Sequence, residues 1–162
     1  MGWENWTSNL IDLVRALRLS ATSRLALVGA GGKSSVLLTL AASGIPFIAT
    51  TTTHLSVEQA AQFSSWLRVK SEKDLAETNW PAGSVLVTGQ EPKQGRIGGI
   101  ENEAEFALLL RIATERRLPV IVEADGAKRL MLKAPAKHEP AIPEWITHVL
   151  VVMGAGGVGK PL

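Results

Sequence analysis

The sequence predicts an α/β protein with three layers, in which a mostly parallel sheet is covered by helices on both faces. Two features lead to this class. Short apolar runs recur along the chain, which is typical of strands buried on both faces of a sheet. Segments with helical periodicity lie between them, and this alternation is typical of parallel strands joined by helices. A chain of 162 residues suffices for one core, so we expect a single domain over residues 1–162.

The expected elements follow from the apolar pattern and the turn residues. Strands are expected at 24–28, 46–51, 66–69, 84–88, 119–123 and 147–153, with the first and the last two buried. Helices are expected at 8–18, 33–43, 56–64, 71–77 and 101–117. Segments 89–99 and 125–145 are rich in glycine or proline and are expected to be loops. Ligands of such folds bind at the carboxyl ends of the strands, so the residues after each strand are candidates for function.

Composition excludes several classes of protein. No apolar run approaches the roughly 20 residues that a membrane-spanning helix needs, and the amphipathic N-terminal segment lacks the features of a signal peptide. We therefore expect no membrane partner. The net charge is only +2, without a long basic patch, so we expect no nucleic-acid partner. The absence of cysteine excludes disulfides and thiolate metal sites, and it fits a cytoplasmic protein.

The segment "GAGGKSS" stands between a predicted strand and a predicted helix, which is where a phosphate-binding turn belongs. Glycines let backbone N–H groups converge on phosphate oxygens, and the helix N-terminus adds its dipole. Lys33 is expected to reach the β- and γ-phosphates of ATP or GTP, and the Ser34 hydroxyl to ligate Mg²⁺. The predicted nucleotide-binding residues of this turn are Gly29, Ala30, Gly31, Gly32, Lys33, Ser34 and Ser35.

The turn departs from the usual G-x-x-x-x-G-K-[ST] pattern, because Leu27 stands where the first glycine belongs. It fits G-x-x-G-K-[ST]-[ST], which resembles the short phosphate loop of Mur-type ATP-dependent ligases. A dinucleotide site is disfavoured, since such a site needs an acidic residue at the end of the next strand and "ATTTTH" has none.

A second glycine segment, "VVMGAGGVGKPL", matches two fingerprints better as a string. It places Gly154, Gly156, Gly159 and Lys160 at the spacing of both a dinucleotide loop and a Walker lysine loop. Pro161 stands where the hydroxyl residue belongs and removes a backbone N–H. We therefore predict that this segment is a flexible end after the last strand and contributes nothing to phosphate binding.

Polar residues follow two other predicted strands. Thr52, Thr53 and His54 end the second strand, where hydroxyls can ligate Mg²⁺ or orient a water beside the γ-phosphate. Glu123 and Asp125 end the strand "PVIVE" in the manner of a Walker-B strand. One of these two acids is expected to hold Mg²⁺ and the other to polarise a water.

The proline-rich stretch 132–143 carries Lys133 and His138, which we expect to face an anionic ligand. Lys93 and Arg96, in the glycine-rich loop, are further candidates for phosphate contact, although a plain solvent-exposed loop explains them equally well. His148 lies in an apolar strand and is expected to be structural.

Taken in order, the motifs GAGGKSS (29–35), TTTTH (50–54), EADG (123–126), KAPAKHEP (133–140) and GKPL (159–162) resemble the YqeC family of accessory proteins of selenium-dependent molybdenum hydroxylases. The resemblance implies a P-loop NTPase-like domain that helps to mature or insert the cofactor of a molybdenum hydroxylase client. It assigns motif positions to Thr51 and Glu139 in addition to the residues above. Family members generally continue past GKPL, so we expect this chain to lack a C-terminal segment.

Three functions remain open from the sequence. The first is a Mg²⁺-dependent NTPase that handles a cofactor or a client enzyme. The second is an ATP-dependent ligase or transferase of small molecules, as the short loop suggests. The third is an adaptor that binds nucleotide without turnover.

Overall fold

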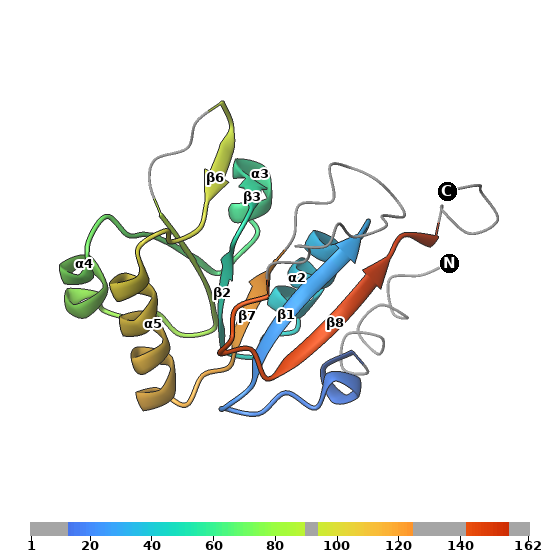
Figure 1. Cartoon of the computed structure of the whole chain (residues 1–162), viewed down its shortest axis with the longest axis horizontal. Coiled ribbons are helices and arrows are strands. Elements are labelled where there is room, and N and C mark those ends of the chain that lie inside the picture. Colours follow the sequence, from blue (N-terminus) through green and yellow to red (C-terminus); the bar gives the residue numbers. More distant parts are fainter. Residues whose placement is uncertain (1–12, 90–93, 125–141, 156–162) are drawn as a thin grey trace.

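A six-stranded parallel sheet forms the centre of the computed structural model, which describes residues 13–89, 94–124 and 142–155 (Figure 1). The strand order is β4-β5-β2-β7-β1-β8. The strands are β1 (Arg24–Ala30), β2 (Phe47–Thr51), β4 (Ser65–Arg68), β5 (Ser84–Thr88), β7 (Val120–Glu123) and β8 (His148–Met153). The predicted α/β class and the mostly parallel sheet are thus confirmed, and each expected strand is present.

Helices cover both faces of this sheet, as expected for strands with apolar side chains on both sides. On one face lie α2 (Lys33–Ala42) and α3 (Val57–Ala60), and on the other α4 (Glu72–Glu77) and α5 (Glu103–Glu115). Alternate residues of β1 show the division: Leu25 and Leu27 pack with the α2 side chains, whereas Ala26 and Val28 pack with those of α5. Residues 13–17 are helical and pack on the α2 face, while the rest of the predicted first helix up to residue 12 lies outside the described residues.

The helix boundaries agree with the predictions except at α3. Helix α2 ends at Ala42 with Ser43 as its C-cap, and the following Gly44 has the left-handed backbone conformation with a φ of 76°. The helix predicted over 56–64 is wrong in length, because α3 stops at Ala60 and the chain enters β4 at Ser65. A capping box between Ser56 and Gln59 fixes the start of α3.

The expected loop 89–99 contains a strand and is corrected by the structure. Strand β6 (Arg96–Gly98) pairs antiparallel with β3 (His54–Ser56) in a separate two-stranded ribbon. In Figure 1 the ribbon rises beyond the carboxyl end of β2. Arg96, a candidate for phosphate contact, is exposed on this ribbon, and Lys93 lies outside the described residues.

The expectation that strand 147–153 is buried is also wrong. Strand β8 is an edge strand that pairs only with β1 among the described elements. The side chains of Val149, Val151 and Met153 are 47%, 65% and 69% exposed. His148 is exposed rather than buried in the core. Apolar composition indicated a strand correctly, but only the strand order determines whether a strand is central or at an edge.

Within the described ranges, no helix has the length and apolar character that crossing a membrane requires.

Candidate phosphate-binding site

The site is built around the turn from β1 to α2. Gly29, Gly31 and Gly32 all have positive φ values, of 98°, 71° and 95°, which glycine adopts without strain. A Cβ atom at Gly29 would stand 2.4 Å from the carbonyl oxygen of Val152 in β8. Glycine is therefore required at position 29 both by backbone conformation and by the close approach of β8.

The N-terminus of α2 is open to an anion. Gly32 is the N-cap residue, no side chain caps the helix, and the first turn contains no acidic residue. Helices α3, α4 and α5 each have a side-chain cap and acidic residues in the first turn. The first backbone N–H groups of α2 and its dipole are thus left for an external acceptor.

Lys33 lies over this turn. Its side chain is 4% exposed, and its Nζ donates a hydrogen bond to the carbonyl oxygen of Gly29 at 2.6 Å. An ammonium group has three donors, so Nζ can keep this bond and still donate to phosphate oxygens. The lysine is held at the turn before any ligand arrives.

Ser34 connects the turn to β7. Its hydroxyl donates to Oε2 of Glu123 at 3.0 Å. Burial raises the pKa of the Glu123 carboxyl above its ordinary range, against the lowering effects of the Ser34 hydrogen bond and of the Lys33 charge. The strand order explains the contact, because β7 is the direct neighbour of β1.

Thr51 ties the end of β2 to the end of β7. Its Oγ1 donates to the main-chain oxygen of Glu123 at 3.0 Å and accepts from the backbone N–H of Thr53 at 2.9 Å. The backbone N–H of Thr52 donates to the same Glu123 oxygen at 3.0 Å. These bonds fix the backbone from which the Glu123 carboxylate projects.

The remaining predicted site residues fall into three groups. Ala30 ends β1, Ser35 is exposed in the first turn of α2, and the Thr52 side chain is exposed beside the Thr51 bonds. His54 is exposed at the start of the β3–β6 ribbon, and no side-chain hydrogen bond within the described part of the chain joins it to Lys33 or Glu123. Asp125, Lys133, His138 and Glu139 lie outside the described residues.

The second glycine segment begins next to the first. Because β8 pairs with β1, the backbone N–H of Gly154 donates to the carbonyl oxygen of Ala30 at 2.9 Å. Gly156, Gly159 and Lys160 lie outside the described residues, so the prediction that they do not bind phosphate stays a prediction.

Gly99 is a site residue that the sequence reasoning missed. A Cβ atom there would stand 1.6 Å from the carbonyl oxygen of Thr51, so the chain after β6 lies directly against the end of β2. The doublet Gly98-Gly99 was the available signal, since a glycine in an extended segment often marks close approach of another backbone.

The arrangement suits Mg²⁺ only if a ligand supplies further oxygens. In the described ranges, no group of three or more acidic or histidine residues is placed to hold a metal. The Ser34 hydroxyl and the Glu123 carboxylate are one neutral and one charged oxygen donor on adjacent elements. Magnesium is usually bound in this way, through one or two carboxylates together with substrate phosphates and water.

Comparison with known proteins agrees with the motif pattern. The sequence profile of a family described as "YqeC protein" matches residues 25–162. The chain is 34% identical over 154 residues to an Escherichia coli (strain K12) protein described as "Uncharacterized protein YqeC". The alignment covers 93% of this chain and 57% of that relative, so the chain spans little more than half of the relative's length. No solved structure matches the sequence.

Proposed function

The chain belongs to the YqeC family, and we propose that it is a Mg²⁺-dependent nucleotide-binding protein with NTPase activity. We propose further that it acts as an accessory factor in the maturation or cofactor handling of a selenium-dependent molybdenum hydroxylase. The nucleotide site rests on the geometry described above. The accessory role rests on the family resemblance of the motifs.

The observation that carries the nucleotide site is the Ser34–Glu123 hydrogen bond at 3.0 Å beside an uncapped, glycine-rich helix N-terminus. A turn that served only to connect β1 and α2 would need neither a buried lysine nor a buried carboxylate. Here both lie together at the carboxyl edge of the sheet, where open α/β folds bind their ligands. This neighbourhood of a buried lysine and a buried carboxylate supports a site that takes both an anion and a cation.

Each residue then has a distinct role. The backbone N–H groups at the start of α2 bind phosphate oxygens, and Lys33 neutralises their charge. Ser34 and Glu123 hold Mg²⁺, which neutralises charge on the phosphates when it is bound. Thr51 is a positioning residue, because it fixes the backbone of Glu123 rather than facing the ligand.

The shortness of the turn supports one alternative function, that of a ligase or transferase. Only Gly31 and Gly32 separate β1 from α2, which fits the compact phosphate loop of an ATP-dependent ligase or transferase. ADP release that depends on a small-molecule co-substrate would favour this alternative over simple hydrolysis. Nucleotide binding without any turnover would favour an adaptor.

Calorimetric titration with ATP, GTP and their non-hydrolysable analogues, with and without Mg²⁺, tests the proposal. We expect Mg²⁺-dependent binding that Lys33→Ala weakens by roughly 1.5–3 kcal/mol, about 10- to 150-fold, since one charge-assisted contact to phosphate is lost. Lys160→Ala is the matched control and should leave the affinity unchanged. Thermal unfolding of both variants verifies that they are folded.

Two results would overturn the site assignment. One is unchanged affinity in Lys33→Ala. The other is a loss of affinity in Lys160→Ala that equals or exceeds the loss in Lys33→Ala, since the second glycine segment would then be the phosphate loop.

A further inference from the structure

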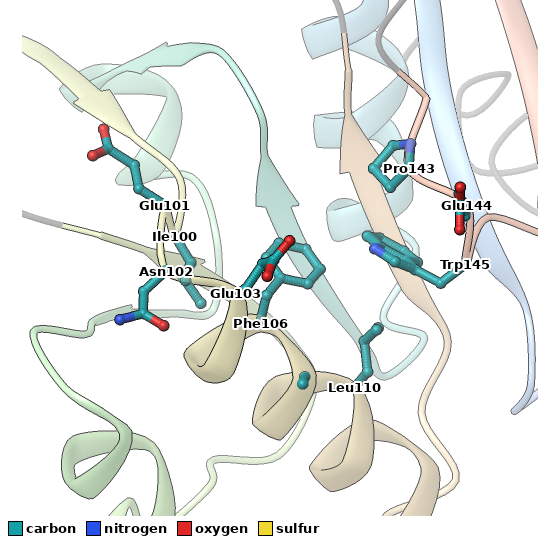
Figure 2. A pocket seen from close by; sticks show the side chains of 10 residues that line it. Ile100, Glu101, Asn102, Glu103, Phe106, Leu110, Pro143, Glu144 and Trp145 are labelled. Atoms are coloured by element: carbon teal, nitrogen blue, oxygen red, sulfur yellow. The ribbon is translucent and has the colours of Figure 1, made fainter.

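A groove of about 450 Å³ lies between the first turns of α5 and the segment 143–145 that precedes β8 (Figure 2). Its floor is apolar and consists of Ile100, Phe106, Leu110, Pro143 and Trp145. Phe106 and Trp145 pack with the α5 side of the sheet, whereas Ser34 and Glu123 belong to the junction with α2. The groove is therefore separate from the phosphate turn.

Three carboxylates stand around the groove. Glu103 comes from the first turn of α5 and Glu144 from the opposite wall, whereas Glu101 precedes α5 and its side chain points away from the two aromatic rings (Figure 2). The lining residues include no lysine, arginine or histidine, and no ion pair with a described residue involves any of the three glutamates. The whole chain has a net charge of +2, so the groove carries the opposite sign to the protein as a whole. An occupant of this groove is expected to be cationic.

The apolar floor of the groove also limits the shape of its occupant. The Phe106 and Trp145 rings are 5.0 Å apart between centroids and inclined by 33°. The two rings pack against each other, so a planar cation can stack only on an outward face of the pair, and the aliphatic lining accepts a hydrocarbon stem. A guanidinium meets these conditions better than an ammonium, because it is flat, is weakly hydrated and can donate two parallel hydrogen bonds to one carboxylate.

We propose that this groove binds an arginine side chain presented by a partner protein. The partner is preferred to a small molecule because all three glutamates are exposed, so the groove covers one side of its occupant. Small-molecule sites generally enclose most of the ligand surface. Arginine and tryptophan are also among the residues that dominate protein–protein binding energies. The site goes beyond the nucleotide function and does not depend on it.

The test is a titration of the isotope-labelled full chain with the peptide acetyl-Gly-Leu-Arg-Leu-Gly-amide, followed by NMR. We expect the amide signals of residues 100–110 and the indole N–H signal of Trp145 to shift. The same peptide with citrulline in place of arginine is isosteric and neutral and should bind at least about tenfold more weakly, since the charge-assisted contacts are lost. Free argininamide should also bind more weakly, because it lacks the flanking leucines.

The matched variants carry the same change in charge. Glu101→Gln/Glu103→Gln/Glu144→Gln should weaken peptide binding by about tenfold or more. The control Glu72→Gln/Glu77→Gln/Glu115→Gln removes three exposed carboxylates on α4 and α5 and should leave binding unchanged. Peptide binding should also persist in Lys33→Ala, so failure of the groove and failure of the nucleotide site are read separately.

Several outcomes would overturn the proposal. They are equal binding of the arginine and citrulline peptides, equal effects of the two triple variants, and no signal shift at the groove at millimolar peptide. Binding of argininamide as tight as that of the peptide would show a small-molecule site and overturn the assignment to a protein partner.

Discussion

The Ser34 hydroxyl donates to Oε2 of Glu123 at 3.0 Å and so joins the first turn of α2 to the last residue of β7. The two residues are 89 positions apart in the sequence. Their contact exists because β7 inserts between β1 and β2 in the sheet. One hydrogen bond thereby joins the proposed phosphate turn to the acidic residue that we propose as a ligand of Mg²⁺.

Glu123→Gln should separate binding from turnover. Glutamine keeps the size of the side chain and can still accept the Ser34 hydrogen bond, but it lacks the charge that we propose acts on the metal and the water. We expect the rate of phosphate release to fall by about 100-fold or more and the nucleotide affinity to fall by a smaller factor, because the amide oxygen is a weaker ligand of Mg²⁺ than a carboxylate. Glu115→Gln, at an exposed position of α5, is the control. Turnover at the wild-type level in Glu123→Gln would show that the Walker-B assignment is wrong.

The stability of the unliganded protein should depend on the protonation of Glu123. Burial raises the pKa of this carboxyl in the folded state above its ordinary value of 4.5. Between the two values the folded chain holds a proton that the unfolded chain has released. The stabilisation is therefore complete below the unfolded pKa and is lost as the pH rises through the folded pKa.

Glutamine at position 123 does not titrate, so Glu123→Gln is the reference for this measurement. The free energy of unfolding of the wild type minus that of the variant should decrease as the pH rises from the ordinary pKa of 4.5 through the raised pKa of the folded protein, and then level off. Urea unfolding over this range measures it. A difference that increases with pH would mean that the pKa is lowered in the folded protein and would contradict the burial argument.

Two adjacent threonines should respond differently to the same substitution. Thr51→Val removes the hydroxyl that bonds Glu123 and Thr53, and it leaves the Thr53 N–H without its acceptor. We expect a loss of about 1–3 kcal/mol of stability. Thr50 is equally buried, yet its Oγ1 has no hydrogen-bond partner in the described structure. Thr50→Val should be neutral or stabilising, because burying an unpaired hydroxyl is costly. Equal losses in urea unfolding would refute the contrast.

The doublet Gly98-Gly99 offers a similar comparison. Gly99→Ala places a methyl group against the carbonyl oxygen of Thr51, which must move together with the end of β2. We expect destabilisation of at least about 2 kcal/mol and weaker nucleotide binding. An added Cβ at Gly98 meets no atom within 4 Å, so Gly98→Ala should change neither property appreciably. Similar thermal unfolding of the two variants would argue against the close approach.

Strands buried on both faces were predictable because their signal is local. The apolar runs of β1, β2, β5 and β7 can be recognised as strands without knowing which strands lie beside them in the sheet. The glycine turn and Lys33 could likewise be predicted, because the strand, the glycines and the start of the helix follow one another in the sequence. The Ser43-Gly44 signal for the end of α2 is equally short-range.

Features that depend on strand order were not predictable. The sequence cannot show that β7 lies between β1 and β2, so the bond from Thr51 to Glu123 was not foreseen. The exposure of β8 has the same cause, because edge and central strands share one composition. Strands β3 and β6 have three residues each, and their polar and glycine residues give no apolar pattern from which a strand could be predicted. Only their pairing with one another defines them as strands.

The contact between β8 and Gly29 determines when, during synthesis, the glycine turn can take its final shape. During synthesis the glycine turn leaves the ribosome early, but the strand that it packs against comes late. The backbone N–H of Arg24 at the start of β1 bonds Thr147, 123 residues further along the chain. At roughly 5–20 residues per second, this separation corresponds to about 6–25 s of translation. We therefore expect a nascent chain to carry the glycine turn for several seconds before β7 and β8 can pack against it, and to bind nucleotide only after both strands have docked.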